Sequence, residues 1–368
     1  MNKLSYAIVY ISISTLILSP FLSFSQIDIK KKLLKDTSNT NVNNLDKVNL
    51  SKDSLLVFSI KEENLKKNNY NNLFFKKDTS ITNFHNQSNF YKNHNFFAGL
   101  GNEGLPETNL IFPVKYRNNK ISPLSFLDHY FFSYKSADYY KAITPFSDVF
   151  FTMGPKRQQI LNALFTRNLG KQINLMANYA IIFSPGIYKF QKSNNNHVII
   201  NSNFRSRNNR YLVIADYFYN RMVFQQNGGI KYDTAFTENS IGHDVMEVNL
   251  KEAESKMKES GFYFRQFFSP GFTKNNKDTI KENDQYIAFG RFSHSFLIKN
   301  QMAQYKDKSP LSGFYQKIYL DSTNTNDSVF FHLLENRLEW SNTKFNIDSG
   351  KFQKFLFSFS VKHNSAIS

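Results

Sequence analysis

The sequence predicts an all-β protein, an antiparallel transmembrane β-barrel of the outer-membrane type that is preceded by a disordered polar leader. Three observations support this fold class. A secretory signal begins the chain, later segments of about ten residues alternate between apolar and polar side chains, and aromatic residues gather at the ends of those segments. A strand needs roughly this length to cross a bilayer at about 45°, whereas strands of soluble sheets usually have about five or six residues.

The N-terminus has the parts of a secretory signal. A short cationic start is followed by a mostly apolar run at 4–24, and small residues precede the bond between Ser25 and Gln26. We therefore predict a signal peptide over residues 1–25 that is cleaved between Ser25 and Gln26. The alternative is an uncleaved membrane anchor, but the serines and the proline of the apolar run weaken it.

Residues 26–97 form a segment rich in Asn, Lys, Ser and Thr. Its hydrophobic periodicity is weak, and such a composition buries too little apolar surface to offset the entropy lost on ordering. We predict a flexible periplasmic leader. The short apolar islands at 55–60 and 72–75 are expected to stay loose, the alternative being that they form strands or dock on a partner.

Residues 98–368 carry the strand pattern and form the predicted barrel domain. The clearest strand is 171–183, where apolar side chains occupy one face and Asn174 and Asn178 occupy the other. The charges of 244–260 predict a solvated loop or, alternatively, a short helix. Further strands are predicted at 148–154, 160–168, 198–205, 211–222, 261–269, 286–298, 330–340 and 354–362.

The polar faces of these strands supply the candidate functional residues. A membrane barrel turns its apolar face to lipid and its polar face to a wet lumen, whereas a soluble sandwich buries the apolar face. Periodicity alone does not separate the two. In a barrel, the pore-lining candidates are Asn174, Asn178, Asn201, Asn203, Arg205, Glu335, Arg337, Glu339, Lys354 and Lys362.

Five short motifs follow one another along the chain: GLGNEGLP at 99–106, SPGIY at 184–188, NNRY at 208–211, QNGGI at 226–230 and VNL at 248–250. In this order they resemble the putative porin family of Bacteroidetes-type outer membranes, over roughly residues 96 to 300. The resemblance implies a β-barrel in the cell outer membrane and passive diffusion of solutes. It supplies no catalytic residues.

The C-terminal end departs from that family. Members look longer, and the last strand of an outer-membrane barrel usually ends on an aromatic residue, whereas this chain ends on Ile367 and Ser368. Spacing of about twenty residues per strand predicts about eleven strands, while bacterial barrels have even numbers. We expect a barrel domain that is incomplete at its C-terminus, the alternative being a small barrel.

Other classes of function find little support. The absence of cysteine excludes disulfides, thiol nucleophiles and Cys-ligated metals. The eight histidines lack metal-ligand spacing, and no cofactor motif occurs, so we predict no metal, no cofactor and no enzymatic activity. Ser125 beside Asp128 and His129 leaves a lumen-facing esterase as a minor alternative. The net charge of +17 is assigned to lipopolysaccharide contacts or a cationic lumen rather than to nucleic acid, which a secreted chain rarely meets.

The sequence therefore predicts passive diffusion of small hydrophilic solutes through a polar lumen in the cell outer membrane. The expected partners are outer-membrane lipid, lipopolysaccharide, the barrel assembly machinery and the solutes themselves. Two alternatives stay open. One is a structural barrel with a closed lumen, and the other is a secreted or surface-anchored β-sandwich binding protein.

Overall fold

The 368-residue chain divides into two compact units, Met1–Asp53 and Ser54–Ser368. The predicted signal peptide and its cleavage position lie outside the residues that the structure, a computed structural model, describes. All described residues belong to the second unit. They are 57–62, 75–76, 97–99, 102–111, 127, 130–142, 144–208, 210–232, 234, 242–274, 285–317, 321, 323–345 and 352–367.

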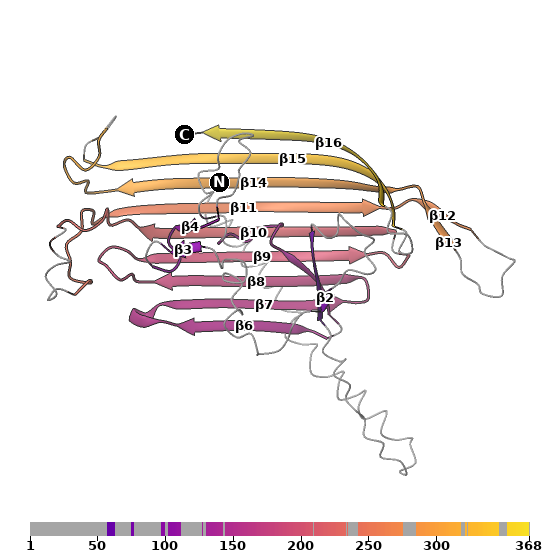
Figure 1. Cartoon of the computed structure of the whole chain (residues 1–368), viewed down its shortest axis with the longest axis horizontal. Coiled ribbons are helices and arrows are strands. Elements are labelled where there is room, and N and C mark those ends of the chain that lie inside the picture. Colours follow the sequence, from indigo (N-terminus) through magenta and orange to yellow (C-terminus); the bar gives the residue numbers. More distant parts are fainter. Residues whose placement is uncertain are drawn as a thin grey trace, which may run out of the picture. The chain divides into compact units, whose positions relative to one another are not determined.

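One sheet of nine antiparallel strands dominates the fold, and its strands lie side by side in chain order (Figure 1). This confirms the predicted all-β class, and each of the nine predicted strands overlaps one of these. β6 and β16 form the two edges, so the nine described strands do not close on themselves. The strands are β6 (Phe146–Met153), β7 (Gln159–Leu169), β8 (Ile173–Ser184), β9 (Ser193–Arg205), β10 (Tyr211–Gln225), β11 (Ala253–Phe268), β14 (Arg291–Asp307), β15 (Thr325–Phe345) and β16 (Phe352–Ile367).

The connections between strands define two ends of the sheet. We call one the hairpin end, because β12 (Gly271–Lys274) and β13 (Gln285–Ala288) pair there between β11 and β14. The opposite one is the loop end. The loop-end connections are 154–158, 185–192, 226–252 and 308–324, and the hairpin-end connections are 170–172, 206–210, 269–290 and 346–351.

The first half of β11 corrects a prediction. Residues 253–260 are strand, whereas the sequence predicts a loop or a short helix over 244–260. Met257 is buried opposite Met222 of β10, while Lys258 on the other face is half-buried. Charged side chains on one face of a strand therefore produced the spacing that suggested a helix.

The N-terminal part of the unit covers one face of the sheet. We call residues 57–62, 102–107, 127 and 130–142 the cover. It includes β1 (Val57–Lys61), which pairs with β5 (Asp138–Ala142) and with β2 (Phe75–Lys76). The cover also includes Glu107, the first residue of β4 (Glu107–Asn109), which pairs with β3 (Phe97–Gly99) in a separate two-stranded ladder.

Two apolar clusters join the cover to the sheet. In the first, Ile60 and Tyr139 of the cover pack with Phe218 of the sheet. In the second, Leu127 of the cover packs with Ile182 of the sheet. The core of this fold therefore lies between the cover and the sheet.

The position of β1 shows that part of the predicted flexible leader is ordered. Residues 57–62 lie within the segment 26–97 for which the sequence predicts flexible chain, yet Val57 and Ile60 are buried. The expectation of loose chain does not hold for this island, because its apolar side chains gain a partner surface on the sheet. Most of the remaining leader lies outside the described residues.

Gly261 of β11 makes room for a core side chain. A Cβ atom there would overlap the ring of Phe218 and lie 3.0 Å from the Ile298 carbonyl oxygen. Overpacking of this kind costs about 1–3 kcal/mol. We expect Gly261→Ala to lower the free energy of unfolding by that amount in urea titrations followed by the fluorescence of Trp340, the only tryptophan. Ser260→Ala on the other face is the control, and equal effects of the two changes would contradict the prediction.

Candidate functional site: the polar face of the sheet

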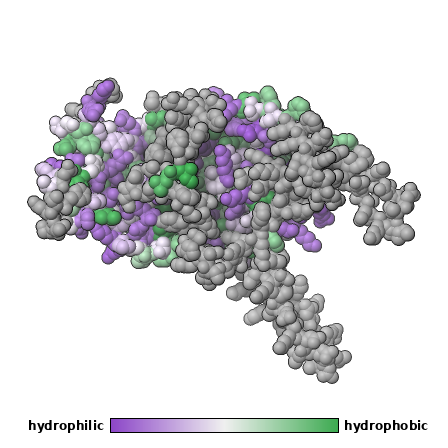
Figure 2. Space-filling model, in the orientation of Figure 1, coloured by the Kyte–Doolittle hydropathy of each residue, from purple (hydrophilic) through white to green (hydrophobic). Residues whose placement is uncertain are grey.

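The face of the sheet that packs against the cover, here the covered face, is rich in polar side chains. Hydrophilic residues also predominate among the coloured atoms on the side shown in Figure 2. Burial of so many polar groups is unusual unless each finds a partner. The buried polar residues of the covered face include Asn162, Thr166, Asn174, Asn178, Ser193, Asn195, His197, Asn201, Asn203, Asp216, Asn220, Glu259, Arg265, Ser293 and Gln301.

The opposite face, here the open face, exposes apolar side chains. The strand register aligns many of them into one continuous row, because each lies directly opposite the next across neighbouring strands. Soluble monomers rarely expose a contiguous apolar surface of this kind. The row runs through Phe165, Ala177, Ile200, Tyr217, Phe262, Ile298 and Leu334, from β7 to β15.

Asparagines of the covered face hold the backbone of the cover. The Nδ2 group of Asn201 donates to the Asp138 carbonyl oxygen at 3.0 Å. Asn220 forms two bonds with Phe132, accepting from its N–H at 2.9 Å and donating to its carbonyl oxygen at 2.9 Å. A primary amide carries both a donor and an acceptor, so it can satisfy backbone N–H and carbonyl groups of the cover that face the sheet.

A buried ion pair links the start of the cover to the centre of the sheet. The Arg265 Nη1 atom lies 2.6 Å from Glu62 Oε1, and both side chains are at most 4% exposed. The second guanidinium nitrogen pairs with Glu339, and the Tyr263 hydroxyl donates to Glu62 at 3.0 Å. Because a buried charge is tolerated only with good partners, these contacts fix Glu62 in place.

Buried tyrosines reinforce the cover. The Tyr139 hydroxyl donates to Asp216 Oδ2 at 2.6 Å. Burial, followed by the nearby Asp216 carboxylate, raises the pKa of Tyr139 well above its usual range. Burial likewise raises the pKa of Tyr140 and raises that of Tyr134 to about 12.

These raised pKa values predict that the cover loses stability at alkaline pH. A tyrosine pKa that is higher in the folded state than the ordinary value of 10.0 contributes stability that is complete below pH 10. That contribution is lost as the pH rises towards 12 and beyond. In a titration of tyrosinate absorbance, we expect Tyr134, Tyr139 and Tyr140 to ionise only above the ordinary range, and Tyr134→Phe to remove one of the late ionisations. Ionisation of every tyrosine in one step near pH 10 would contradict this.

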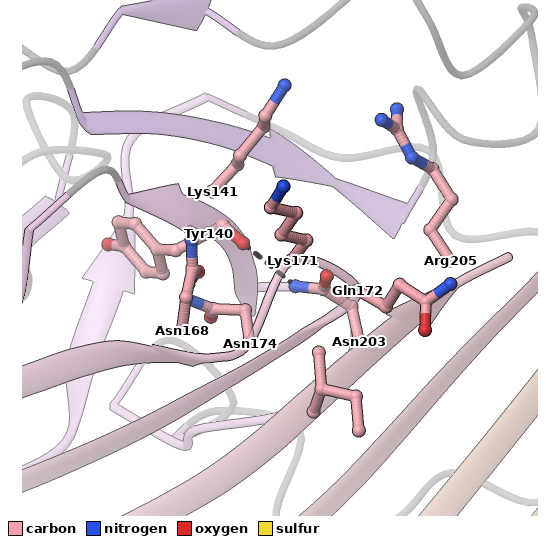
Figure 3. Close-up of a pocket in the computed structure, with 9 residues that line it drawn as sticks. Tyr140, Lys141, Asn168, Lys171, Gln172, Asn174, Asn203 and Arg205 are labelled. Carbon is pink, nitrogen blue, oxygen red and sulfur yellow. Dashed lines mark hydrogen bonds between the residues drawn. The ribbon is translucent and has the colours of Figure 1, made fainter. Parts of the chain in front are cut away.

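A small polar cavity lies at the hairpin end, where β5 meets the β7–β8 turn and the end of β9 (Figure 3). Asn203 Nδ2 donates to the Tyr140 carbonyl oxygen at 3.0 Å, and Asn174 Nδ2 donates to Asn168 Oδ1 at 2.7 Å. The first bond fastens β5 to the sheet, and the second orients Asn168 of β7, whose Nδ2 group donates to the Ala142 carbonyl oxygen of β5. The lining residues are Tyr140, Lys141, Asn168, Lys171, Gln172, Ile173, Asn174, Asn203 and Arg205.

The pore-lining candidates fall in two groups. Those from β8 and β9, namely Asn174, Asn178, Asn201 and Asn203, are buried on the covered face, and Arg205 lines the hairpin-end cavity. Those from β15 and β16 form a partly exposed ion network: Glu335 lies 2.7 Å from Arg337 and 3.7 Å from Lys362, and Arg337 lies 3.7 Å from Glu339. The side chain of Lys354 lies outside the described residues.

Sequence reasoning did not single out Glu62, Arg265, Asp216 or Asn220. The alternation of the predicted strand 261–269 could have revealed Arg265, since it lies on the face opposite Phe262, Phe264 and Phe268. Glu62 gave no such signal, because its partner lies two hundred residues away in the chain.

In the part of the chain that the structure describes, no helix is long and apolar enough to cross a membrane.

The distribution of side chains between the two faces of the sheet indicates the class of the protein. Long antiparallel strands that expose an apolar face and bury a polar one have the pattern of transmembrane β-sheet proteins, the reverse of a soluble sandwich.

The comparison with known families agrees with that class. The family model described as a putative porin matches residues 59–366, which is more than half of the chain, and the chain therefore belongs to this family. No curated protein matches the chain, and neither does any solved structure.

Proposed function

We propose that the protein is a porin-like channel of the cell outer membrane, through which small hydrophilic solutes diffuse passively. The observation that carries this proposal is the inverted burial of the sheet, with apolar side chains such as Tyr217 and Phe262 exposed and asparagines such as Asn201 buried. Lipid would cover the open face, and the covered face would line the lumen. Family membership supports the same conclusion.

Solutes would pass along β15 and β16 rather than along the centre of the sheet. The cover bonds to β9, β10 and β11 through Asn201, Asn220 and Arg265, all of which are buried. By contrast, Arg337 and Lys362 have side chains 36% and 55% exposed. The cover would therefore narrow the lumen and restrict it to small solutes.

The direct test is single-channel recording of the refolded chain in planar bilayers. We expect discrete conductance steps from protein whose migration on a gel shifts on heating, as closed barrels do. Folded protein that produces no conductance would overturn passive diffusion. Protein that stays soluble and monomeric without detergent would overturn the membrane assignment itself.

A structural barrel with a closed lumen is the second candidate. The observation that favours it is the pair of apolar clusters between the cover and the sheet, which include Tyr139 and Leu127. A lumen packed in this way excludes water as well as solute. The absence of conductance from correctly inserted protein is the result expected of this candidate.

Ion selectivity would depend on the network around Glu335. Its carboxylate pairs with both Arg337 and Lys362, so Glu335→Gln adds one net positive charge to the network and should shift the reversal potential towards anion preference. Arg337→Gln should shift it the opposite way. The folded state should change by less than about 1 kcal/mol in both, because these pairs are partly exposed. Unchanged reversal potentials in both variants would place the network outside the solute path.

Outer-membrane lipid and lipopolysaccharide are the proposed partners of the open face, and the barrel assembly machinery would insert the chain. Towards the loop end, Arg221 and Lys258 lie directly opposite each other on that face, and Lys256 lies two residues from Lys258 on the same face. Adjacent like charges repel, and anionic phosphates of lipopolysaccharide would relieve the repulsion. Cell fractionation that finds the protein outside the outer membrane would contradict this location.

A further inference from the structure

The cavity at the hairpin end has a strongly one-sided charge. Lys141, Lys171 and Arg205 line it, four further residues contribute side-chain amides, and none of the nine described residues that line it is acidic. In Figure 3 the side chains of Lys141 and Arg205 extend to the same side, with that of Lys171 between them. Cations gathered without carboxylates on the cavity wall create a positive potential that attracts anions.

The fold fixes the backbone positions of these three residues from three directions. Lys141 belongs to β5 of the cover, which the Asn203 amide fastens to the sheet. Lys171 belongs to the tight β7–β8 turn, where Gly170 adopts a φ of +74° that L side chains rarely reach. Arg205 ends β9, and its backbone N–H donates to the Gln172 carbonyl oxygen of that turn at 2.9 Å. The backbone that carries the three cations is thus fixed before any ligand arrives, which reduces the entropy lost on binding, although Lys141 and Lys171 themselves are exposed.

The size of the cavity limits the ligand. Its volume is about 50 Å³, and one water needs about 10–15 Å³ on the same measure, so the cavity takes a group the size of about four waters. A tetrahedral oxyanion has four oxygens and therefore matches this space. Lysines act as point charges towards phosphate oxygens, and a guanidinium binds two of them side by side.

We propose that this cavity is a binding site for small phosphate-type oxyanions at the hairpin-end opening of the lumen. Lys171 and Arg205 provide the charge-assisted bonds, Lys141 adds a third cation from the cover, and the amides of Gln172 and Asn174 donate to the remaining oxygens. Binding itself does not depend on an open lumen. The role of the site in concentrating anionic solutes before they pass rests on the proposed channel function.

Binding is tested with inorganic phosphate added to the refolded full-length chain in a phosphate-free detergent, by ³¹P NMR line broadening or calorimetry. We expect saturable binding that Lys171→Gln and Arg205→Gln each weaken at least about tenfold, as the loss of one charged hydrogen bond predicts. Arg207→Gln is the matched control: Arg207 is exposed in the neighbouring turn at the same end and does not line the cavity. Heat-shifted migration and Trp340 fluorescence identify variants that remain folded.

Each outcome decides the proposal. No saturable binding to the folded wild type, or equal binding by all four proteins, would overturn it. Loss of phosphate binding by both the wild type and Arg207→Gln when phosphatidylglycerol is added to the micelles would assign the site to a lipid headgroup instead of a solute. If phosphate binds as expected but bilayers record no conductance, the site stands and the channel function fails. Conductance without phosphate binding leads to the reverse conclusion.

Discussion

Arg265→Met is expected to lower the free energy of unfolding by about 3–5 kcal/mol, the largest effect of any single change discussed for this protein. The guanidinium pairs with Glu62 at 2.6 Å and with Glu339, and it also donates to Ser293 Oγ at 3.1 Å. Methionine keeps much of the volume but removes the cation that faces the Glu62 carboxylate in its buried site, where the Tyr263 hydroxyl also donates to it.

The measurement is urea unfolding in detergent or lipid, followed by the fluorescence of Trp340. Arg337→Met is the matched control, because it removes the same group from the same face at a site 36% exposed, where ion pairs contribute less than about 1 kcal/mol. If Arg265→Met does not fold, Arg265→Lys retains one charge and should show an intermediate loss. Equal stability of the Arg265 and Arg337 variants would refute a buried ion pair between the cover and the sheet.

The second large effect compares one substitution on the two faces of the sheet. Asn220→Leu is expected to lower the free energy of unfolding by about 2–4 kcal/mol, because it removes both hydrogen bonds that Asn220 makes with the Phe132 backbone. Asn220 also lies 3.0 Å from His197 Nδ1, which would lose its contact as well. Because the bonds between Asn220 and Phe132 would be lost, the cover should become more sensitive to protease, and the conductance of the channel should rise.

Asn336→Leu is the control on the open face. Asn336 is exposed, and its Oδ1 atom contacts His294 Nε2 at 2.8 Å. Since lipid would surround this face, leucine there should be neutral or slightly stabilising in a bilayer. Opposite responses to the same change are the expected signature of a membrane sheet. Destabilisation by both variants to the same extent would mean that both faces are buried in protein.

The strands were predictable because their signal is local. In 171–183 the period-two alternation places Asn174 and Asn178 on one face, and the structure has both on the covered face. Prediction failed at 253–260, where Lys256 and Lys258 occupy the open face near its end. Towards the loop end, beyond the row of apolar side chains, the open face tolerates charged residues. The two faces of the strand then differ little in hydrophobicity, so the alternation that marks a strand disappears there.

The candidate site was predictable only in part. Polar residues of the covered face can be identified from alternation, and the pore-lining candidates came from it. Whether such a residue meets water or a second layer of protein depends on contacts that alternation does not encode. Asn203 bonds to Tyr140 of the cover, whereas Arg337 remains partly exposed, although their strands look alike in sequence.

By itself, the sequence determined that this protein is a sheet of long strands with one apolar and one polar face, because side-chain direction along a strand follows from the backbone geometry of adjacent residues. Only the tertiary structure decided which groups cover the polar face. The pairing of Glu62 with Arg265 joins residues 203 positions apart, and each makes sense as a buried charge only beside the other. Contacts at that separation depend on how the whole chain folds back on the sheet, and no local pattern specifies them.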